Sequence, residues 1–227
     1  MFQDRRRGAP PDGGGEQART AGGGRFTGSL TVPEHPTGLV VFAHGNGSSR
    51  RSARNRAVAA ELNHAGLATF LFDLLTPEEA ADRAEVFDIP LLADRLAEAT
   101  GELAERPETA GLPIGWFGAG TGAAAALWAA AEPDAPVRAV VSRGGRPDLA
   151  EPRLPAVTAA TLLIVGGDDE LVLDLNRGAQ AWLRCENRLE VLAGAGRLFR
   201  EPGALAAVAH LAERWFSGHL RPAQDRA

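Results

Sequence analysis

The sequence predicts a single α/β domain with a mostly parallel central sheet and helices on both of its faces. Three observations lead to this prediction. Continuous apolar runs bounded by turn residues, such as residues 38–43 and 161–165, are typical of buried parallel strands. Segments with helical periodicity separate these runs. The 227 residues, of which 44% are hydrophobic, suffice for one core.

The first half of the chain supplies three strands and two helices of this pattern. Residues 26–32 alternate in strand fashion and end at Pro33. In the segment that follows the second strand, Val58 and Leu62 stand at helical spacing, and Gly66 is a stop signal. We predict strands at residues 26–32, 38–43 and 67–71, and helices at residues 50–65 and 89–106.

The second half continues the same alternation. An apolar run that begins at Ile114 enters a cluster of small residues, and an Ala-rich segment that favours a helix leaves it and runs to Ala131. Later apolar runs end in turns rich in Gly and charged residues, as buried strands do. We predict further strands at residues 137–142, 161–165 and 189–192, and helices at residues 173–184 and 203–219.

Composition excludes several classes of function. The formal net charge of −5 argues against a nucleic-acid surface, and we find no apolar stretch long enough to span a membrane. One cysteine, Cys185, rules out an internal disulfide framework and favours a reducing cytoplasm. The folded domain is expected at residues 25–220, between a disordered Gly- and Arg-rich tail at residues 1–24 and a tail at residues 221–227.

The central stretch, Ile114-Gly115-Trp116-Phe117-Gly118-Ala119-Gly120-Thr121-Gly122, reads as a strand, a sharp turn and a helix. It occupies the place of a nucleophile elbow, the motif G-x-S-x-G in which a serine sits on a strained bend above a sheet. Gly120 stands where that serine would be. The sequence therefore predicts the bend without its reactive atom.

Four turns that follow predicted strands stand out: residues 44–47 (His-Gly-Asn-Gly), 118–122, 167–169 (Gly-Asp-Asp) and 194–197 (Gly-Ala-Gly-Arg). Their order and spacing resemble the α/β-hydrolase superfamily, particularly its dienelactone-hydrolase-like branch, from about residue 31 to residue 220. The resemblance implies an α/β-hydrolase fold without a cap domain, and relatives that hydrolyse esters or lactones.

The resemblance also implies roles for particular residues. Asp169 corresponds to the acid of the catalytic triad, and Arg197 stands where the family has its histidine. The backbone N–H groups of Asn46 and Thr121 would form the oxyanion hole, and His44 and Gly45 belong to the same oxyanion turn.

Two of the three triad side chains are therefore replaced. Glycine has no nucleophile, and arginine stays protonated and cannot act as a general base at neutral pH. The sequence predicts a degenerate hydrolase with little or no serine-hydrolase activity, a pseudoenzyme. Ser142 also ends a predicted strand at the correct edge of the sheet, so a displaced catalytic role for it is an alternative to a turn residue.

The remaining groups favour binding. The helix that begins near Thr121 presents free N–H groups, and Arg197 offers a guanidinium suited to a carboxylate or another anion. The sharper hypothesis is a pocket that holds a small carboxylate, ester or lactone-like ligand. The other reading is that Arg197 pairs with Asp169 and closes the old site.

Two further functions stay open. The chain could be a hydrolase or a nonhydrolytic enzyme that uses the oxyanion turns with Asp169 and displaced groups. Alternatively, Gly118, Gly120 and Ala123 fit the dinucleotide fingerprint G-x-G-x-x-G/A, and Arg143 would then accommodate an NADP 2′-phosphate. In the main reading we expect no cofactor and no metal, since the acidic run 168–170 lacks further ligands at a suitable spacing. The oligomeric state is left open.

Overall fold

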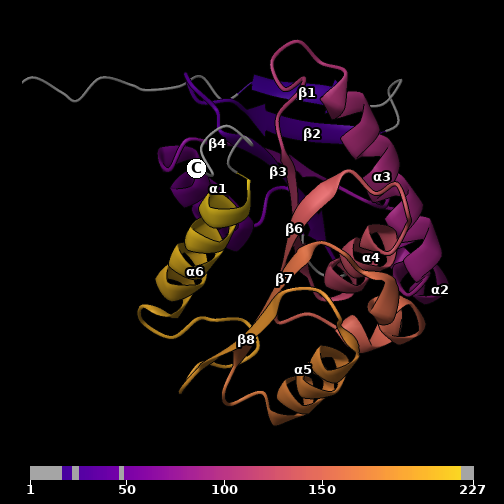
Figure 1. Cartoon of the computed structure of the whole chain (residues 1–227), viewed down its shortest axis with the longest axis vertical. Coiled ribbons are helices and arrows are strands. Elements are labelled where there is room, and N and C mark those ends of the chain that lie inside the picture. The colour runs from indigo at the N-terminus through magenta and orange to yellow at the C-terminus, as the bar shows by residue number, and fades with distance from the viewer. Residues whose placement is uncertain (1–16, 22–25, 46–48, 221–227) are drawn as a thin grey trace, which may run out of the picture.

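The computed structural model describes residues 17–21, 26–45 and 49–220. Within them, eight strands form one sheet in the order β1-β2-β4-β3-β5-β6-β7-β8 (Figure 1). Pairing is antiparallel between β1 and β2 and between β2 and β4, and parallel from β4 to β8. The strands are β1 Gln17–Ala21, β2 Phe26–Thr31, β3 Gly38–His44, β4 Leu67–Phe72, β5 Ile114–Ala119, β6 Val137–Arg143, β7 Ala160–Gly166 and β8 Asn187–Leu192.

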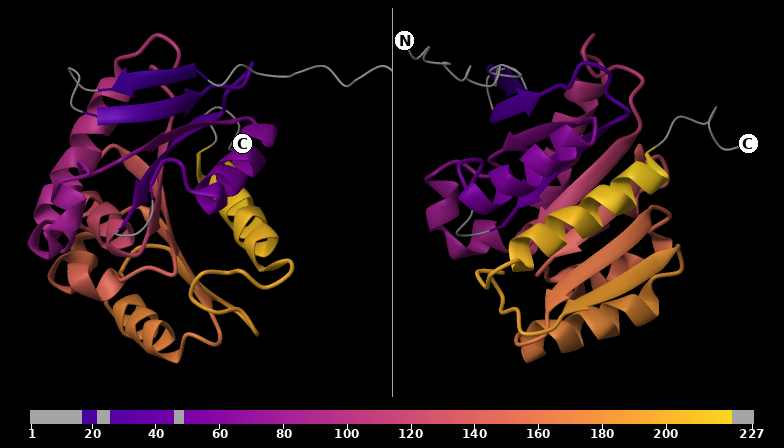
Figure 2. Two further views of the ribbon diagram at one scale, coloured as in Figure 1. Left: turned by 180° about the vertical axis from the view of Figure 1, so that it is seen from behind. Right: turned by 90° about the vertical axis from the view of Figure 1, so that its left-hand side faces the viewer.

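Helices cover both faces of the sheet, as the two further views in Figure 2 make clear. Helices α1 and α6 lie together on one face, whereas α3, α4 and α5 lie on the other. The helices are α1 Ala53–His64, α2 Arg83–Val86, α3 Ile89–Ala104, α4 Thr121–Ala130, α5 Glu170–Trp182 and α6 Ala204–His219, with 3-10 turns η1 Glu79–Ala81 and η2 Pro147–Ala156. The predicted α/β fold class is confirmed.

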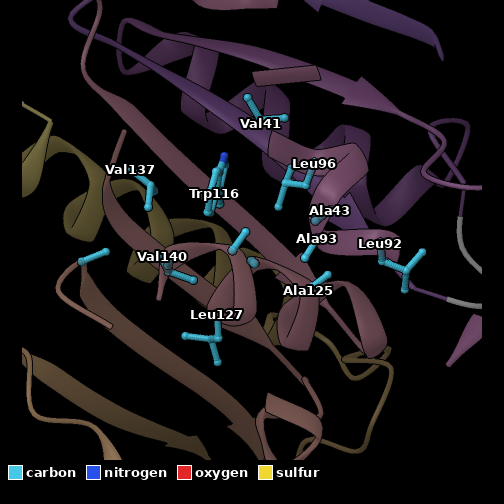
Figure 3. Packing of buried hydrophobic residues seen from close by; sticks show 14 of the residues in the cluster. Val41, Ala43, Leu92, Ala93, Leu96, Trp116, Ala125, Leu127, Val137 and Val140 are labelled. Carbon is cyan, nitrogen blue, oxygen red and sulfur yellow. The ribbon is translucent and has the colours of Figure 1, made fainter. Parts of the chain in front are cut away.

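Each face of the sheet has its own apolar core. Trp116 of β5 lies at the centre of the core under α3 and α4, among side chains of α3, α4 and β6 (Figure 3). Its indole Nε1 donates a hydrogen bond to Thr100 Oγ1 at 3.0 Å, so the one polar atom of this buried ring is satisfied. On the other face, Phe42 and Phe117 pack with their ring centroids 4.8 Å apart.

The N-terminal boundary differs from the prediction. Residues 17–21 form β1, which pairs with β2 from Gln17↔Leu30 to Ala21↔Phe26, so the disordered tail predicted for residues 1–24 is wrong in this segment. We predicted disorder because the segment contains few apolar residues. Pairing between strands uses backbone hydrogen bonds, which do not require apolar side chains. The other residues of that predicted tail, 1–16 and 22–24, and the predicted tail 221–227 lie outside the described residues. No helix in the described part of the chain is long and apolar enough to cross a membrane.

Candidate functional site

Gly120 forms the sharp turn between β5 and α4. Its backbone has φ 58° and ψ −127°, a conformation that residues with a side chain rarely adopt. A Cβ placed on Gly120 would meet only the Cα of Gly45, at 4.0 Å. The bend predicted from the sequence is therefore present, and among the described residues only Gly45 comes within 4 Å of a side chain placed on it.

The neighbouring glycines of the elbow, Gly118 and Gly122, allow α4 to pack closely against the strands beside it. A Cβ on Gly118 would lie 2.4 Å from the Cα of Ala123, and one on Gly122 would lie 2.2 Å from the carbonyl oxygen of Ala43. Both contacts would be severe clashes, so α4 can pack this closely against β5 and β3 only because these residues are glycine. This packing accounts for Gly118 of the G-x-G-x-x-A pattern without a dinucleotide.

The oxyanion turn follows β3 and lies against the start of α4. Gly45 donates its N–H to the carbonyl of Ala119 at 2.9 Å, and a Cβ on Gly45 would lie 2.6 Å from both the N and the Oγ1 of Thr121. Thr121 is buried, and the N–H groups in the first turn of a helix have no acceptor within the helix. Thr121 and Gly45 thus lie in contact, whereas Asn46, the other predicted donor of the oxyanion hole, lies outside the described residues.

The structure places Asp169 and Arg197 in adjacent loops but does not pair them. Asp169 caps α5 by accepting a hydrogen bond from the N–H of Val172 at 3.4 Å, and its Oδ2 is buried without a hydrogen-bond partner among the described residues. The loops meet where the N–H of Asp168 donates to the carbonyl of Ala195 at 3.0 Å. The Arg197 side chain is exposed, and no ion pair between it and Asp169 is present. The hypothesis that this pair closes the site is therefore wrong.

A row of three residues crosses the sheet beside the elbow. His44 of β3, Ala119 of β5 and Arg143 of β6 are partners in strand register. Because side chains alternate along a strand, His44 lies on the same face as Phe42, and Ala119 on the same face as Phe117. This is the face covered by α1 and α6. The two strands that flank the elbow thus each place a nitrogen-bearing side chain next to it.

His44 is only 6% exposed, and burial lowers its pKa below the ordinary value. Asp73 opposes this effect, since its Oδ1 lies 3.4 Å from His44 Nε2, although not in hydrogen-bonding geometry. Asp73 also accepts the N–H of Arg50 at 2.8 Å and holds the segment that leads into α1. His44 is therefore neutral at pH 7 and takes the structural place expected of the oxyanion turn.

Arg143 is the residue that the sequence reasoning weighed only as a nucleotide contact. It is 7% exposed, its Nη1 has no hydrogen-bond partner among the described residues, and its Cζ lies 5.8 Å from the centre of the Phe117 ring. Burial lowers the pKa of its guanidinium to about 10, with a further contribution from the charge of Arg54. Arg143 remains charged at pH 7. Its position at the end of an apolar strand was visible in the sequence, but its lack of a carboxylate partner was not.

The structure gives no support to the displaced catalytic role considered for Ser142. Its side chain is fully buried, and its Oγ has no hydrogen-bond partner among the described residues. A Cβ on Gly145 would lie 2.2 Å from that Oγ and 2.5 Å from the Cβ of Ala123, so the hydroxyl is packed towards α4. A serine needs an adjacent base to react, and none contacts this one.

Comparison with known proteins agrees with this geometry. No family model matches the chain. The crystal structure of a dienelactone hydrolase from Anabaena variabilis is 52% identical, with a TM-score of 0.87 over 92% of this chain and 99% of that one. The chain belongs to the dienelactone hydrolase family. The α/β-hydrolase resemblance found in the sequence is therefore confirmed, although the comparison does not test the loss of catalytic residues.

The chain is also similar to more distant solved structures and to two curated proteins. A dienelactone hydrolase-like promiscuous phosphotriesterase from metagenomic libraries has a TM-score of 0.70 at 20% sequence identity. Est1E from Butyrivibrio proteoclasticus has a TM-score of 0.75 at 14% sequence identity. At such low identity, these two similarities show the fold alone. Proteins from two strains of Mycobacterium tuberculosis, each named "Putative phosphoribosyl transferase", are 60% identical over 211 residues. These residues are 93% of this chain but only 48% of each relative, so the chain spans about half the length of these relatives.

Proposed function

We propose that this dienelactone hydrolase family member binds a small anionic ligand beside the elbow and does not hydrolyse esters through it. The observation that carries the proposal is Gly120, which keeps the elbow conformation but has no side chain, and the described residues leave the position of a Cβ there without a close contact. Acyl transfer needs a nucleophile and a base, and glycine and a permanently protonated arginine supply neither.

The groups that remain around the elbow favour an anion. The first turn of α4 presents backbone N–H groups and a partial positive charge. Arg143, with its buried guanidinium, ends the neighbouring strand, and none of the ion pairs among the described residues includes it. Arg197 is exposed in the structure, so we assign the ligand's main cation to Arg143 and give Arg197 at most a peripheral contact.

Hydrolysis of a chromogenic short-chain ester tests the loss of catalysis. We expect no turnover above background for the parent chain, and measurable turnover for the double variant Gly120→Ser plus Arg197→His, which restores a nucleophile and a base. Adding Asp169→Ala to the double variant should lower that rate by removing the acid that orients the new histidine. Turnover by the parent that survives Asp169→Ala would show another catalytic site and overturn the proposal.

Thermal-shift titration with acetate, succinate and benzoate tests the binding half of the proposal. We expect at least one of these carboxylates to raise the unfolding temperature of the parent, because a ligand that binds only the folded state stabilises it. Arg197→Ala should leave this shift nearly unchanged. If none of these three carboxylates raises the unfolding temperature of the parent, the anion-binding function fails.

The name carried by the curated relatives bears on this chain only through the half of those proteins that it matches. Nearly all of this chain matches a dienelactone hydrolase structure, whereas it spans about half of each relative. We propose that phosphoribosyl transfer, if those relatives perform it, belongs to the half that this chain does not match. The chain by itself is then expected to show none in a direct assay.

A further inference from the structure

Strand β8 has one edge that no other strand in the described part of the chain covers. It is the last strand in the sheet order and pairs there only with β7 (Figure 2). All of β8 keeps a regular register with β7, and it contains neither proline nor glycine. Such an edge presents a row of backbone N–H and C=O groups that can pair with another strand.

The hydrogen bonds to β7 show which residues of β8 have these free groups. The N–H of Thr161 donates to the carbonyl of Glu186, the residue before β8, at 2.8 Å. In a parallel pair, alternate residues direct both backbone groups to the same neighbour, so the even-numbered residues of β8 face β7. Asn187, Leu189 and Val191 therefore direct theirs to the open edge. Outside the sheet pairing, no backbone hydrogen bond among the described residues uses them.

The charges of β8 favour one way of pairing this edge with itself. Two copies related by a two-fold axis would pair β8 antiparallel. When Leu189 stands opposite Leu189 of the second copy, Arg188 stands opposite Glu190 of the second copy on both sides of the axis. The next register in either direction that keeps the free backbone groups together sets Arg188 against Arg188 or Glu190 against Glu190. Like charges directly opposite each other destabilise a strand pair.

The side chains of this edge are available for such a contact. Arg188 and Glu190 form an ion pair within β8, yet the Arg188 side chain is 67% exposed and has room to contact a second carboxylate. Opposite residues at these positions of an antiparallel pair have Cα atoms about 4.5 Å apart, which brings their side chains together. Val191 is 42% exposed, and a paired strand would cover part of it.

We propose that β8 is the interface between two copies of this chain, which pair through antiparallel β8 strands centred on Leu189. Leu189 exchanges two backbone hydrogen bonds with its equivalent, and Asn187 does the same with Val191 of the second copy. The two sheets then form one continuous sheet. This inference goes beyond the anion-binding function and does not depend on it, because β8 contains none of the residues proposed for that site.

Sedimentation velocity of charge variants tests the interface. We expect the parent to show a monomer–dimer equilibrium that depends on concentration. Arg188→Glu and Glu190→Arg should each raise the dimer Kd by about tenfold or more, because the two-fold axis sets like charges against each other twice. Arg56→Glu is the matched control, since Arg56 is exposed on α1, and it should change the Kd by less than about twofold.

Two rescue measurements separate charge pairing from general damage to the surface. The double variant Arg188→Glu plus Glu190→Arg restores opposite charges across the axis and should dimerise with a Kd within about threefold of the parent. An equimolar mixture of the two single variants should associate, although each variant alone stays monomeric at the same concentration. A strand damaged by the substitutions would be rescued in neither measurement.

The backbone supplies an independent readout. Val191→Pro removes an N–H that faces the open edge and no hydrogen bond to β7, so it should abolish the dimer and leave the fold intact. Hydrogen exchange should show that the N–H groups of Leu189 and Val191 gain protection as protein concentration rises. Those of Arg188 and Glu190 should be protected at every concentration, because they bond to β7. Should Val191→Pro not fold, the charge variants and the exchange pattern decide.

Three results would overturn the inference. One is a parent that stays monomeric up to its solubility limit. Another is a dimer that both single charge variants retain, which would place the contact on a different surface. The third is a double variant that stays monomeric, which would exclude the register centred on Leu189. The ligand titrations and ester assays test the anion-binding function separately, so either proposal can fail while the other stands.

Discussion

Gly120 has only a hydrogen where a serine would carry its Cβ and Oγ, yet its backbone keeps the elbow conformation. With φ at 58°, glycine holds this geometry without the penalty that a side chain brings. The strain that an active elbow stores is therefore absent here. The proposed loss of the nucleophile and the relief of backbone strain would both follow from glycine at this position.

We predict that Gly120→Ser lowers the free energy of unfolding by about 1–2 kcal/mol, because serine adopts this backbone region at a cost. The matched control is Gly101→Ser in α3, where the position is exposed and a Cβ meets nothing within 4 Å. The control should be neutral or slightly stabilising, since glycine is a poor helix residue. Urea unfolding of both variants measures the difference, and equal losses would contradict the strain assigned to Gly120.

The buried side chain of His44 makes the stability of the fold depend on pH. Burial lowers its folded pKa below the unfolded value of 6.5, so between these two values the unfolded chain binds a proton that the folded chain does not. Stability should therefore fall as pH drops below about 6.5, until the folded pKa is reached. We predict that His44→Gln reduces this loss between pH 7.5 and 5.0 in urea unfolding. His210→Gln, at an exposed position, should follow the parent; a parallel loss in His44→Gln would contradict a buried neutral histidine.

At the residue scale, the sequence allowed us to predict the position of those candidate site residues that lie in recognisable motifs after strands. Gly120, Thr121 and Asp169 follow strands in the order of a known family, and the structure brings them to the expected edge of the sheet. The role proposed for Arg143 could not be predicted, because it depends on the absence of an ion pair with any carboxylate of the described residues. The orientation of Arg197 could not be predicted either, since the sequence does not show whether a loop side chain faces a cleft or solvent.

Strand β5 and helix α3 meet through a hydrogen bond that holds the base of the elbow strand. The indole of Trp116 donates to Thr100, whose hydroxyl in turn donates to the carbonyl of Leu96 at 2.7 Å. Each of these polar groups is buried, so the chain of bonds cannot be replaced by water.

We predict that Thr100→Val lowers the free energy of unfolding by about 1–3 kcal/mol, because it leaves the Trp116 N–H buried without an acceptor. Thr100→Ser keeps the hydroxyl and should lose less. Guanidinium unfolding followed by tryptophan fluorescence compares the two. A serine variant as unstable as the valine variant would show that the lost methyl group, and not the hydrogen bond, determines the result.

At the element scale, the parallel strands were the most predictable because their apolar runs are continuous. Every residue of β3, β4 and β7 is buried, which is the pattern that predicted them. Boundaries were less predictable where a cap decides them: α5 begins at Glu170, three residues before the prediction, because Asp169 caps it. The turns η1 and η2 and the short helix α2 carry no periodic pattern and were missed.

Two large apolar cores share one sheet in the described part of the chain, beside a small third cluster of Val165, Val172 and Leu173. Leu62 of α1 lies in one core and Leu96 of α3 in the other, both fully buried. Because β3, β5 and β6 contribute side chains to both cores, neither core can unfold and leave the other intact.

We predict that Leu62→Ala and Leu96→Ala each lower the free energy of unfolding by about 2–5 kcal/mol, while near- and far-ultraviolet circular dichroism still report one coincident transition. Leu171→Ala is the control, since Leu171 is 72% exposed and should cost little. Two separate transitions in either core variant would show that the faces of the sheet fold independently.

The clearance above Gly120 also offers a position for a chemical label. The chain has one cysteine, Cys185, which is half-buried and whose thiol pKa is raised by burial, so it reacts slowly with thiol reagents. A cysteine introduced at position 120 would stand at the N-terminus of α4, where a thiolate is stabilised. A fluorophore or a tethered fragment attached there would report directly on what enters the space beside the elbow.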